Sequence, residues 1–214
     1  MHKFIVLISG RGSNLQAICE AGLTPYISCV ISNNAKALGL EYAKQLGIHT
    51  EIINHQEFNS RQEFEMVLAQ TLDTFSCDLI VLAGFMRILS HWFINKYTNK
   101  IINIHPSLLP SFTGINAQTQ AFNSKVKISG ATVHYVTAEL DHGPIIAQGI
   151  VGIKSLDTID TVTNKILDLE HVIYPFIIKK ILNNLVNVKN NCVYTENLDT
   201  DRTELGKFNC SIFF

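Results

Sequence analysis

Two polar side chains, Asn103 and His105, flank Ile104 where an apolar run ends. On a β-strand both would point to the same face of the sheet, at the carboxyl end where α/β sheets bind ligands. An amide and an imidazole there suit acyl or formyl transfer, because the amide can donate to a developing oxyanion while the imidazole gives or takes a proton. Taken alone, however, the pattern favours a simple hydrogen-bonding pair at a strand end.

The best carboxylate partner for this histidine is Asp141, in the loop Glu139–Pro144. A nearby anion favours the charged imidazolium. No Gly-x-Ser-x-Gly elbow is present, so a Ser-His-Asp hydrolase is not expected and Ser107 is not assigned as a nucleophile. The eight histidines form neither a His-Glu-x-x-His pattern nor a helical His pair with a carboxylate, so no metal site is expected. We expect His134 and His171 to line a pocket or to be core polar residues.

A glycine-containing loop, Ser9–Asn14, follows the first apolar run and precedes a helical pattern. Glycines let the backbone approach a ligand, and a helix N-terminus offers unpaired N–H groups to a phosphate. The dinucleotide fingerprint is incomplete, because Leu15 replaces its third glycine and Ser32-Asn33-Asn34 replaces its acidic residue. A turn that only caps a helix is the alternative. If phosphate is the ligand, its donors are Gly12, Ser13 and Asn14.

Short apolar runs alternate with segments of helical periodicity over the first half of the chain. The pattern β-α-β-α-β, with unbroken apolar runs, predicts a mostly parallel sheet covered by helices on both faces. The expected strands are Phe4–Ile8, Ser28–Ile31, Thr50–Ile53, Leu79–Ala83 and Ile101–Ile104. The expected helices begin near Asn14 and cover Ala37–Leu46 and Ser60–Phe75, the last with Ser60 as N-cap.

The second half begins with His105–Pro110, whose two prolines predict an ordered loop. The elements expected after it are two strands, Ala131–Val136 and Ile145–Ile153, and a long amphipathic helix, Thr158–Asn183. No repeat or linker interrupts the chain. We therefore expect one α/β domain over residues 1–190, in which the C-terminal part extends the sheet and ends in the long helix. Residues 191–214 are expected to be a peripheral tail.

The composition is that of an ordinary globular protein, with 17 Lys+Arg, 18 Asp+Glu and a net charge of -1. The absence of a basic run argues against nucleic acid as the partner and favours small molecules. The apolar runs are far shorter than the roughly 20 residues that cross a bilayer. The five cysteines are scattered and lack the spacing of a disulfide framework or a zinc site. We therefore expect a soluble, cytoplasmic protein with reduced thiols and no membrane partner.

Three segments, Ile8–Ala17, Leu82–Leu89 and Asn103–Pro110, closely resemble the phosphoribosylglycinamide formyltransferases, the formyltransferase family of de novo purine biosynthesis. Thr132-Val133-His134 and Leu140–Pro144 also match, in the same order. The resemblance covers roughly residues 3–185 and is specific.

The resemblance implies a formyltransferase fold, with a Rossmann-like nucleotide- and phosphate-binding half over about 1–100 and a catalytic and folate-binding half over about 101–190. It also implies an enzyme that moves formyl from the cosubstrate 10-formyltetrahydrofolate to the amine of glycinamide ribonucleotide, without a metal. The implied catalytic residues are Asn103, His105 and Asp141. The implied nucleotide contacts are Gly12, Ser13, Asn14 and Glu170. The implied folate contacts are Arg61, Met86, Arg87, Ile88, Leu89, Asn103, Asp141 and the loop Thr137–Gly143.

Two residues depart from the family pattern: His142 stands where many members have a glycine, and Gln118 where a histidine is frequent. Their effect on ligand contacts stays open, as does a cis Leu109-Pro110 bond. Methionyl-tRNA formyltransferase and formyltetrahydrofolate deformylase share the Asn103–Pro110 signature, but each carries a further domain. The length of 214 residues and the neutral charge therefore favour a small nucleotide as acceptor. A non-catalytic folate- or nucleotide-binding protein is another alternative, against which the three catalytic residues argue. A monomer and a homodimer are both compatible with the sequence.

Overall fold

The computed structural model describes residues 2–75, 77–196 and 211–214 of the 214-residue chain. These residues form two compact units, 1–103 and 104–214, and each is described by itself. The boundary falls inside one strand, β5 (Ile101–His105). The expectation of a single domain over residues 1–190 stays a prediction.

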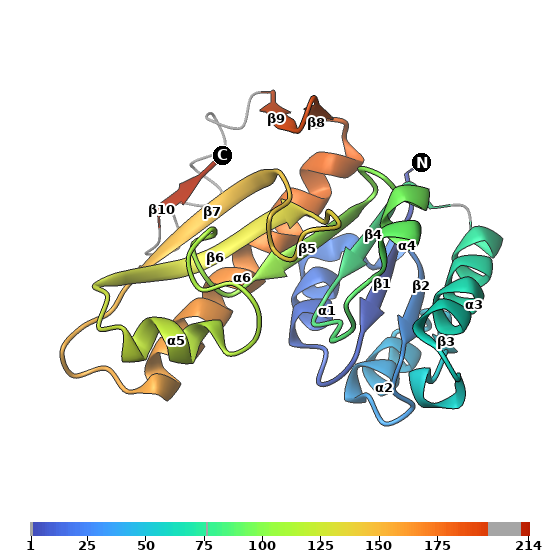
Figure 1. The fold of residues 1–214 in the computed structure, drawn as a ribbon, viewed down its shortest axis with the longest axis horizontal. Coiled ribbons are helices and arrows are strands. Elements are labelled where there is room, and N and C mark those ends of the chain that lie inside the picture. The colour runs from blue at the N-terminus through green and yellow to red at the C-terminus, as the bar shows by residue number, and fades with distance from the viewer. Residues whose placement is uncertain (1, 76, 197–210) are drawn as a thin grey trace. The chain divides into compact units, whose positions relative to one another are not determined.

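The first unit is built on a parallel sheet with the strand order β5-β4-β1-β2-β3 (Figure 1). Its other strands are β1 (Phe4–Ile8), β2 (Ile27–Ser32), β3 (Thr50–Ile52) and β4 (Leu79–Leu82). All residues of β1 and β4 are buried, because the two strands lie inside the sheet and have no polar alternation. Because β1, β2, β3 and β4 run parallel, their carboxyl ends bring the loops that follow them to one edge of this unit.

Four helices connect the strands of this unit. They are α1 (Ser13–Ile18), α2 (Leu38–Gln45), α3 (Arg61–Thr74) and α4 (His91–Lys96), and a π-helical turn, Cys19–Leu23, follows α1. Ser60 caps α3 by accepting a hydrogen bond from the Glu63 N–H, as its sequence position predicts. Buried Glu65 of α3 accepts hydrogen bonds from the backbone N–H and the hydroxyl of Ser90, the N-cap of α4. The end of one helix is thus fixed by a carboxylate of another.

In the second unit the strand order is β6-β7-β10, and both pairs are antiparallel. These strands are β6 (Ile128–Tyr135), β7 (Ile145–Gly152) and β10 (Ser211–Phe213). The short helix α5 (Ala117–Asn123) precedes β6, and the long helix α6 (Ile159–Leu182) packs on β6 and β7. A Cβ at Gly149 would lie 2.6 Å from a methyl of Leu169, so the glycine lets α6 approach β7 closely.

The expected fold class is confirmed: strands and helices alternate, the sheet is mostly parallel, its C-terminal part adds further strands, and the chain forms a long late helix. Several elements were not predicted: α4, α5, the strand β10 and the hairpin of β8 (Val186–Lys189) with β9 (Cys192–Thr195). The expected peripheral tail falls partly on residues 197–210, outside the described part. The Leu109-Pro110 bond is cis. Among the described residues, no helix is long and apolar enough to span a membrane.

Candidate functional site

His105 is the last residue of β5, and its side chain is buried. Its Nε2 lies 2.9 Å from the carbonyl oxygen of Phe112, which can only accept, so Nε2 carries a proton and donates. Its Nδ1 faces Asp141, at 3.6 Å from Oδ2. The structure thus brings together the histidine and the carboxylate that the sequence places 36 residues apart.

Asp141 lies in the loop between β6 and β7, with its side chain 7% exposed. The carboxylate also accepts a hydrogen bond of 2.7 Å from the backbone N–H of Gly114. Its backbone is left-handed (φ 56°), a conformation that aspartate tolerates better than most residues. His142, which replaces a family glycine, does not have positive φ, so this position does not require glycine. The departure therefore leaves the backbone of this loop unstrained at residue 142.

The base of the same loop requires Gly143. A Cβ at this position would lie 1.7 Å from the carbonyl oxygen of Tyr135, so any side chain forces the backbones apart. We expect Gly143→Ala to lower the free energy of unfolding by about 1–3 kcal/mol, as overpacking does. Gly152→Ala is the matched control, because its Cβ would meet no atom within 4 Å. Chemical denaturation of both variants tests this, and equal midpoints would contradict it.

Thr132 of β6 holds the proline-containing loop after β5. Its hydroxyl donates to the carbonyl of Ser107 at 2.7 Å and accepts from the backbone N–H of Leu109 at 3.0 Å. Gln148 donates to the carbonyl of Leu109 and to the same hydroxyl. Ser107 is buried and donates to the Ser111 carbonyl, which agrees with its exclusion as a nucleophile. The loop beside His105 is therefore rigidly hydrogen-bonded.

His134 is a second buried histidine, on β6. Burial lowers its pKa, so the imidazole is neutral near pH 7. Its Nδ1 lies 2.9 Å from the carbonyl of Tyr135 and so donates to it. This burial agrees with the expectation that His134 is a core polar residue.

Asn103 lies two residues before His105 on β5, and it is half-buried.

The glycine loop of the first unit leads into α1. Gly12 is left-handed (φ 81°) and caps α1, in whose first turn Ser13 and Asn14 lie. A Cβ at Gly12 would lie 2.7 Å from the Cα of Gly39, and the N–H of Gly39 donates to the carbonyl of Gly10. The loop is thus packed against the first turn of α2. Sequence reasoning missed Gly39, whose only signal is a glycine near the start of a helix.

The remaining expected ligand residues are distributed over both units. In the first, Arg61 begins α3 and is exposed, Ile88 is exposed, and Leu89 is buried. In the second, Glu170 is buried on α6.

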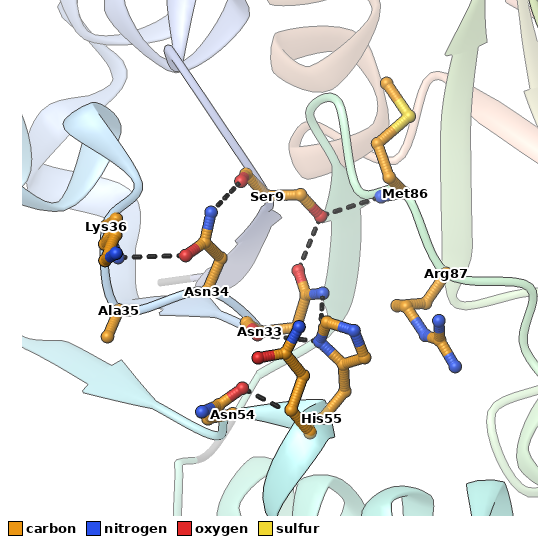
Figure 2. Close-up of a pocket in the computed structure, with 10 residues that line it drawn as sticks. Ser9, Asn33, Asn34, Ala35, Lys36, Asn54, His55, Met86 and Arg87 are labelled. Atoms are coloured by element: carbon orange, nitrogen blue, oxygen red, sulfur yellow. Dashed lines mark hydrogen bonds between the residues drawn. The ribbon is translucent and has the colours of Figure 1, made fainter.

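A pocket of about 560 Å³ lies at the carboxyl edge of the first unit (Figure 2). It includes the expected folate residues Met86 and Arg87. The other lining residues, none of which was predicted, are Ser9, Asn33, Asn34, Ala35, Lys36, Asn54, His55 and Gln56. All come from loops that follow β1, β2, β3 and β4.

Within residues 2–75, 77–196 and 211–214, no group of three His, Cys, Asp or Glu side chains could hold a metal ion. Burial raises the pKa of the Cys29 thiol to about 12 and that of Cys77 to about 11, which disfavours thiolate chemistry at these positions. Cys210 lies outside the described residues.

Residues 2–178 match the formyl transferase family. The chain belongs to the formyl transferase family. The resemblance expected from the sequence is thereby confirmed. The match spans both units and includes every candidate site residue named above.

Several relatives have a more specific name than that of the family. The chain is 44% identical over 180 residues to the phosphoribosylglycinamide formyltransferase of Escherichia coli, covering 82% of this chain and 85% of that protein. It is 45% identical to the solved structure of phosphoribosylglycinamide formyltransferase from Coxiella burnetii, with a TM-score of 0.87, covering 91% of this chain and 93% of that one.

Another relative is much longer. The chain is 44% identical over 193 residues to the human trifunctional purine biosynthetic protein adenosine-3, covering 88% of this chain. It spans about a fifth of the length of such trifunctional relatives (20% and 19% of the first two).

Proposed function

We propose that this chain transfers the formyl group of 10-formyltetrahydrofolate to the amine of N1-(5-phospho-D-ribosyl)glycinamide, within de novo purine (IMP) biosynthesis. The products are the N2-formyl compound and tetrahydrofolate. The observation that carries the proposal is the buried His105–Asp141 pair beside the half-buried Asn103. The names of the relatives support the identity of the acceptor. We further propose that the protein is cytoplasmic.

In the proposed reaction the substrate amine attacks the formyl carbon, and a tetrahedral intermediate forms directly between the two substrates. Asn103 and His105 donate hydrogen bonds to its oxyanion. The C–N bond to the folate then breaks, and the proton lost by the amine passes to the folate nitrogen with the help of water. The carboxylate of Asp141 faces Nδ1 of His105 and orients the imidazole toward the reacting groups.

The hydrogen bond between His105 and Phe112 sets a requirement for this mechanism. The Nε2 proton is directed at the Phe112 carbonyl and Nδ1 at Asp141, so both ring nitrogens face protein acceptors. The formyl oxygen must therefore displace the Phe112 carbonyl or share the Nε2 proton with it. Phe112 has a left-handed backbone (φ 56°), and its segment can relax when the carbonyl is released.

Two sets of residues are proposed to hold the substrates. Gly12, Ser13 and Asn14, at the start of α1, bind the phosphate, and Glu170 binds the ribose. The folate contacts proposed from the family are Arg61, Met86, Arg87, Ile88, Leu89, Asn103 and Asp141. Holding amine and formyl side by side would supply a large part of the rate acceleration.

The test is a formyl-transfer assay that follows the absorbance of the folate, with and without the glycinamide ribonucleotide. We expect turnover only with acceptor present, and Asn103→Ala to lower kcat by about 10²–10³-fold, as for loss of an oxyanion donor. Asn95→Ala, on the exposed side of α4, is the control and should retain parental kcat. Equal folate turnover without acceptor would show a hydrolase instead, and no turnover would refute the transferase.

A further inference from the structure

Strand β7 has β6 on one side and the C-terminal strand β10 on the other, and β10 ends the sheet (Figure 1). β6 pairs with β7 from Ile145 to Gly152, whereas β10 pairs with only three of its residues, Gln148, Gly149 and Ile150. The rest of the outer edge of β7 pairs with no strand that the structure describes. The backbone N–H and C=O groups of such an edge are a template for another strand.

The sequence of β7 lacks two features that commonly keep an edge strand from pairing. Its eight residues, Ile-Ile-Ala-Gln-Gly-Ile-Val-Gly, include neither a charged residue nor a proline. An uncharged strand can also lie antiparallel beside a second copy of itself without repulsion between like charges. Protection of this edge therefore depends on the strand that covers it.

That cover is short and is held by few side chains. Ile212 lies opposite Gly149, so its side chain points to the face on which α6 packs. The ring of Phe214 contacts the ring of Phe176 on α6, with the two centroids 5.6 Å apart. Phe213 points to the other face and is 54% exposed. Ile212 and Phe214 are therefore the side chains that hold β10 in place.

A second copy of this chain offers the edge a longer partner than β10 does. Two β7 strands related by a two-fold axis would pair antiparallel, which is the direction that β10 already uses. Such a pair has eight residues available on each strand, against three in β10. In the intact chain β10 has the advantage of covalent attachment, which gives it a high effective concentration at the edge.

We propose that the outer edge of β7 is a strand-docking surface, that β10 occupies it within one chain, and that release of β10 lets β7 of a second copy pair there. The interface is an antiparallel pair of two β7 strands about a two-fold axis. The last residues of the chain thereby control its self-association. The proposal concerns association alone, and it holds or fails independently of the formyl-transfer reaction.

Sedimentation velocity of the full-length chain, at several concentrations, tests the proposal. Ile212→Asp combined with Phe214→Ser removes both apolar contacts of β10 and places a charge against α6. We expect the mass of this double variant to rise to about twice that of the parent at the same concentration, as for a two-fold pair. Phe213→Ser is the matched control in the same strand, because its exposed ring points away from α6, and it should have the parental mass.

A further substitution, Ile150→Lys, shows whether β7 itself forms the interface. Ile150 is half-buried and lies opposite Ser211 of β10. Added to the double variant, it places a lysine in the uncovered edge, where the charge opposes pairing, and the mass should return to the parental value. Association that persists with Ile150→Lys overturns the proposal.

Phe214→Ser alone is measured in parallel as a milder variant, so that a folding defect of the double variant does not decide the result. It removes only the ring contact with Phe176 and should raise the mass at the highest concentrations. Circular dichroism and thermal melting identify the variants that are folded. Parental mass in every folded variant of Ile212 and Phe214 overturns the proposal.

Discussion

His105→Ala lowers the kcat of formyl transfer by about 10²–10⁴-fold, the range for loss of a positioned acid or base. KM for both substrates should change little, because the imidazole is buried at the strand end and its contribution grows as charge develops on the formyl oxygen. Steady-state kinetics with each substrate varied in turn measure the two effects separately.

The variant also removes the hydrogen bond to Phe112, which costs about 1–3 kcal/mol of stability if the carbonyl stays buried. Thermal melting must therefore accompany the kinetics. His105→Gln provides a second variant that keeps a side-chain donor, and His91→Ala, an exposed histidine on α4, is the matched control. A folded His105→Ala protein with more than about a tenth of the parental kcat would exclude the proposed role of His105, since loss of an oxyanion donor alone costs about 10²–10³-fold.

Gly12→Ala is expected to lower the free energy of unfolding by about 2–5 kcal/mol, the sum of left-handed strain and overpacking. The new Cβ would lie 2.7 Å from the Cα of Gly39, where two backbones meet and no flexible side chain can yield. If the loop shifts and the protein stays folded, KM for the phosphate-bearing substrate rises about tenfold for each 1.4 kcal/mol of binding free energy that is lost.

Gly10→Ala is the control for this experiment, because its Cβ meets no atom within 4 Å and its φ is not positive. Its free energy of unfolding should stay within about 0.5 kcal/mol of the parent. Urea denaturation of both variants gives the comparison. Equal midpoints would show that the close approach of Gly12 and Gly39 does not constrain the loop.

The parallel strands could be predicted because their apolar runs are long, unbroken and followed by helical periodicity. The two short helices α4 and α5 could not be predicted from the sequence. The N-cap of α4, Ser90, is held by a hydrogen bond to Glu65, a residue on another helix. Helix α5 begins after Asn116, whose backbone is left-handed. Neither signal is visible in a hydrophobic pattern. Ser28–Ile31 and Ile101–Ile104 were predicted shorter than the observed strands, since pairing with neighbours extends a strand beyond its apolar residues.

The candidate site, like the fold, could be predicted only in part. Local rules place Asn103 and His105 on one strand and make Asp141, in a loop between two later strands, the candidate carboxylate; the family resemblance supports all three. Three features could not be predicted, because each joins segments that no local pattern relates. They are the hydrogen bond from His105 to Phe112, the contact of Gly12 with Gly39, and the pocket at the carboxyl edge of the first unit. Loops at strand ends meet only when the sheet order is known.

Strand β5 has a consequence for protein engineering. The boundary between the two compact units, at Asn103 and Ile104, lies inside this strand and between two of the three proposed catalytic residues, Asn103 and His105. The boundary between two compact units looks like a natural place to divide the chain. A split enzyme or a circular permutant cut there would nevertheless lose the covalent spacing between Asn103 and His105. Termini are better tolerated at exposed turns. The exposed turn Ser124–Lys125, between α5 and β6, is therefore the position at which we would divide the chain.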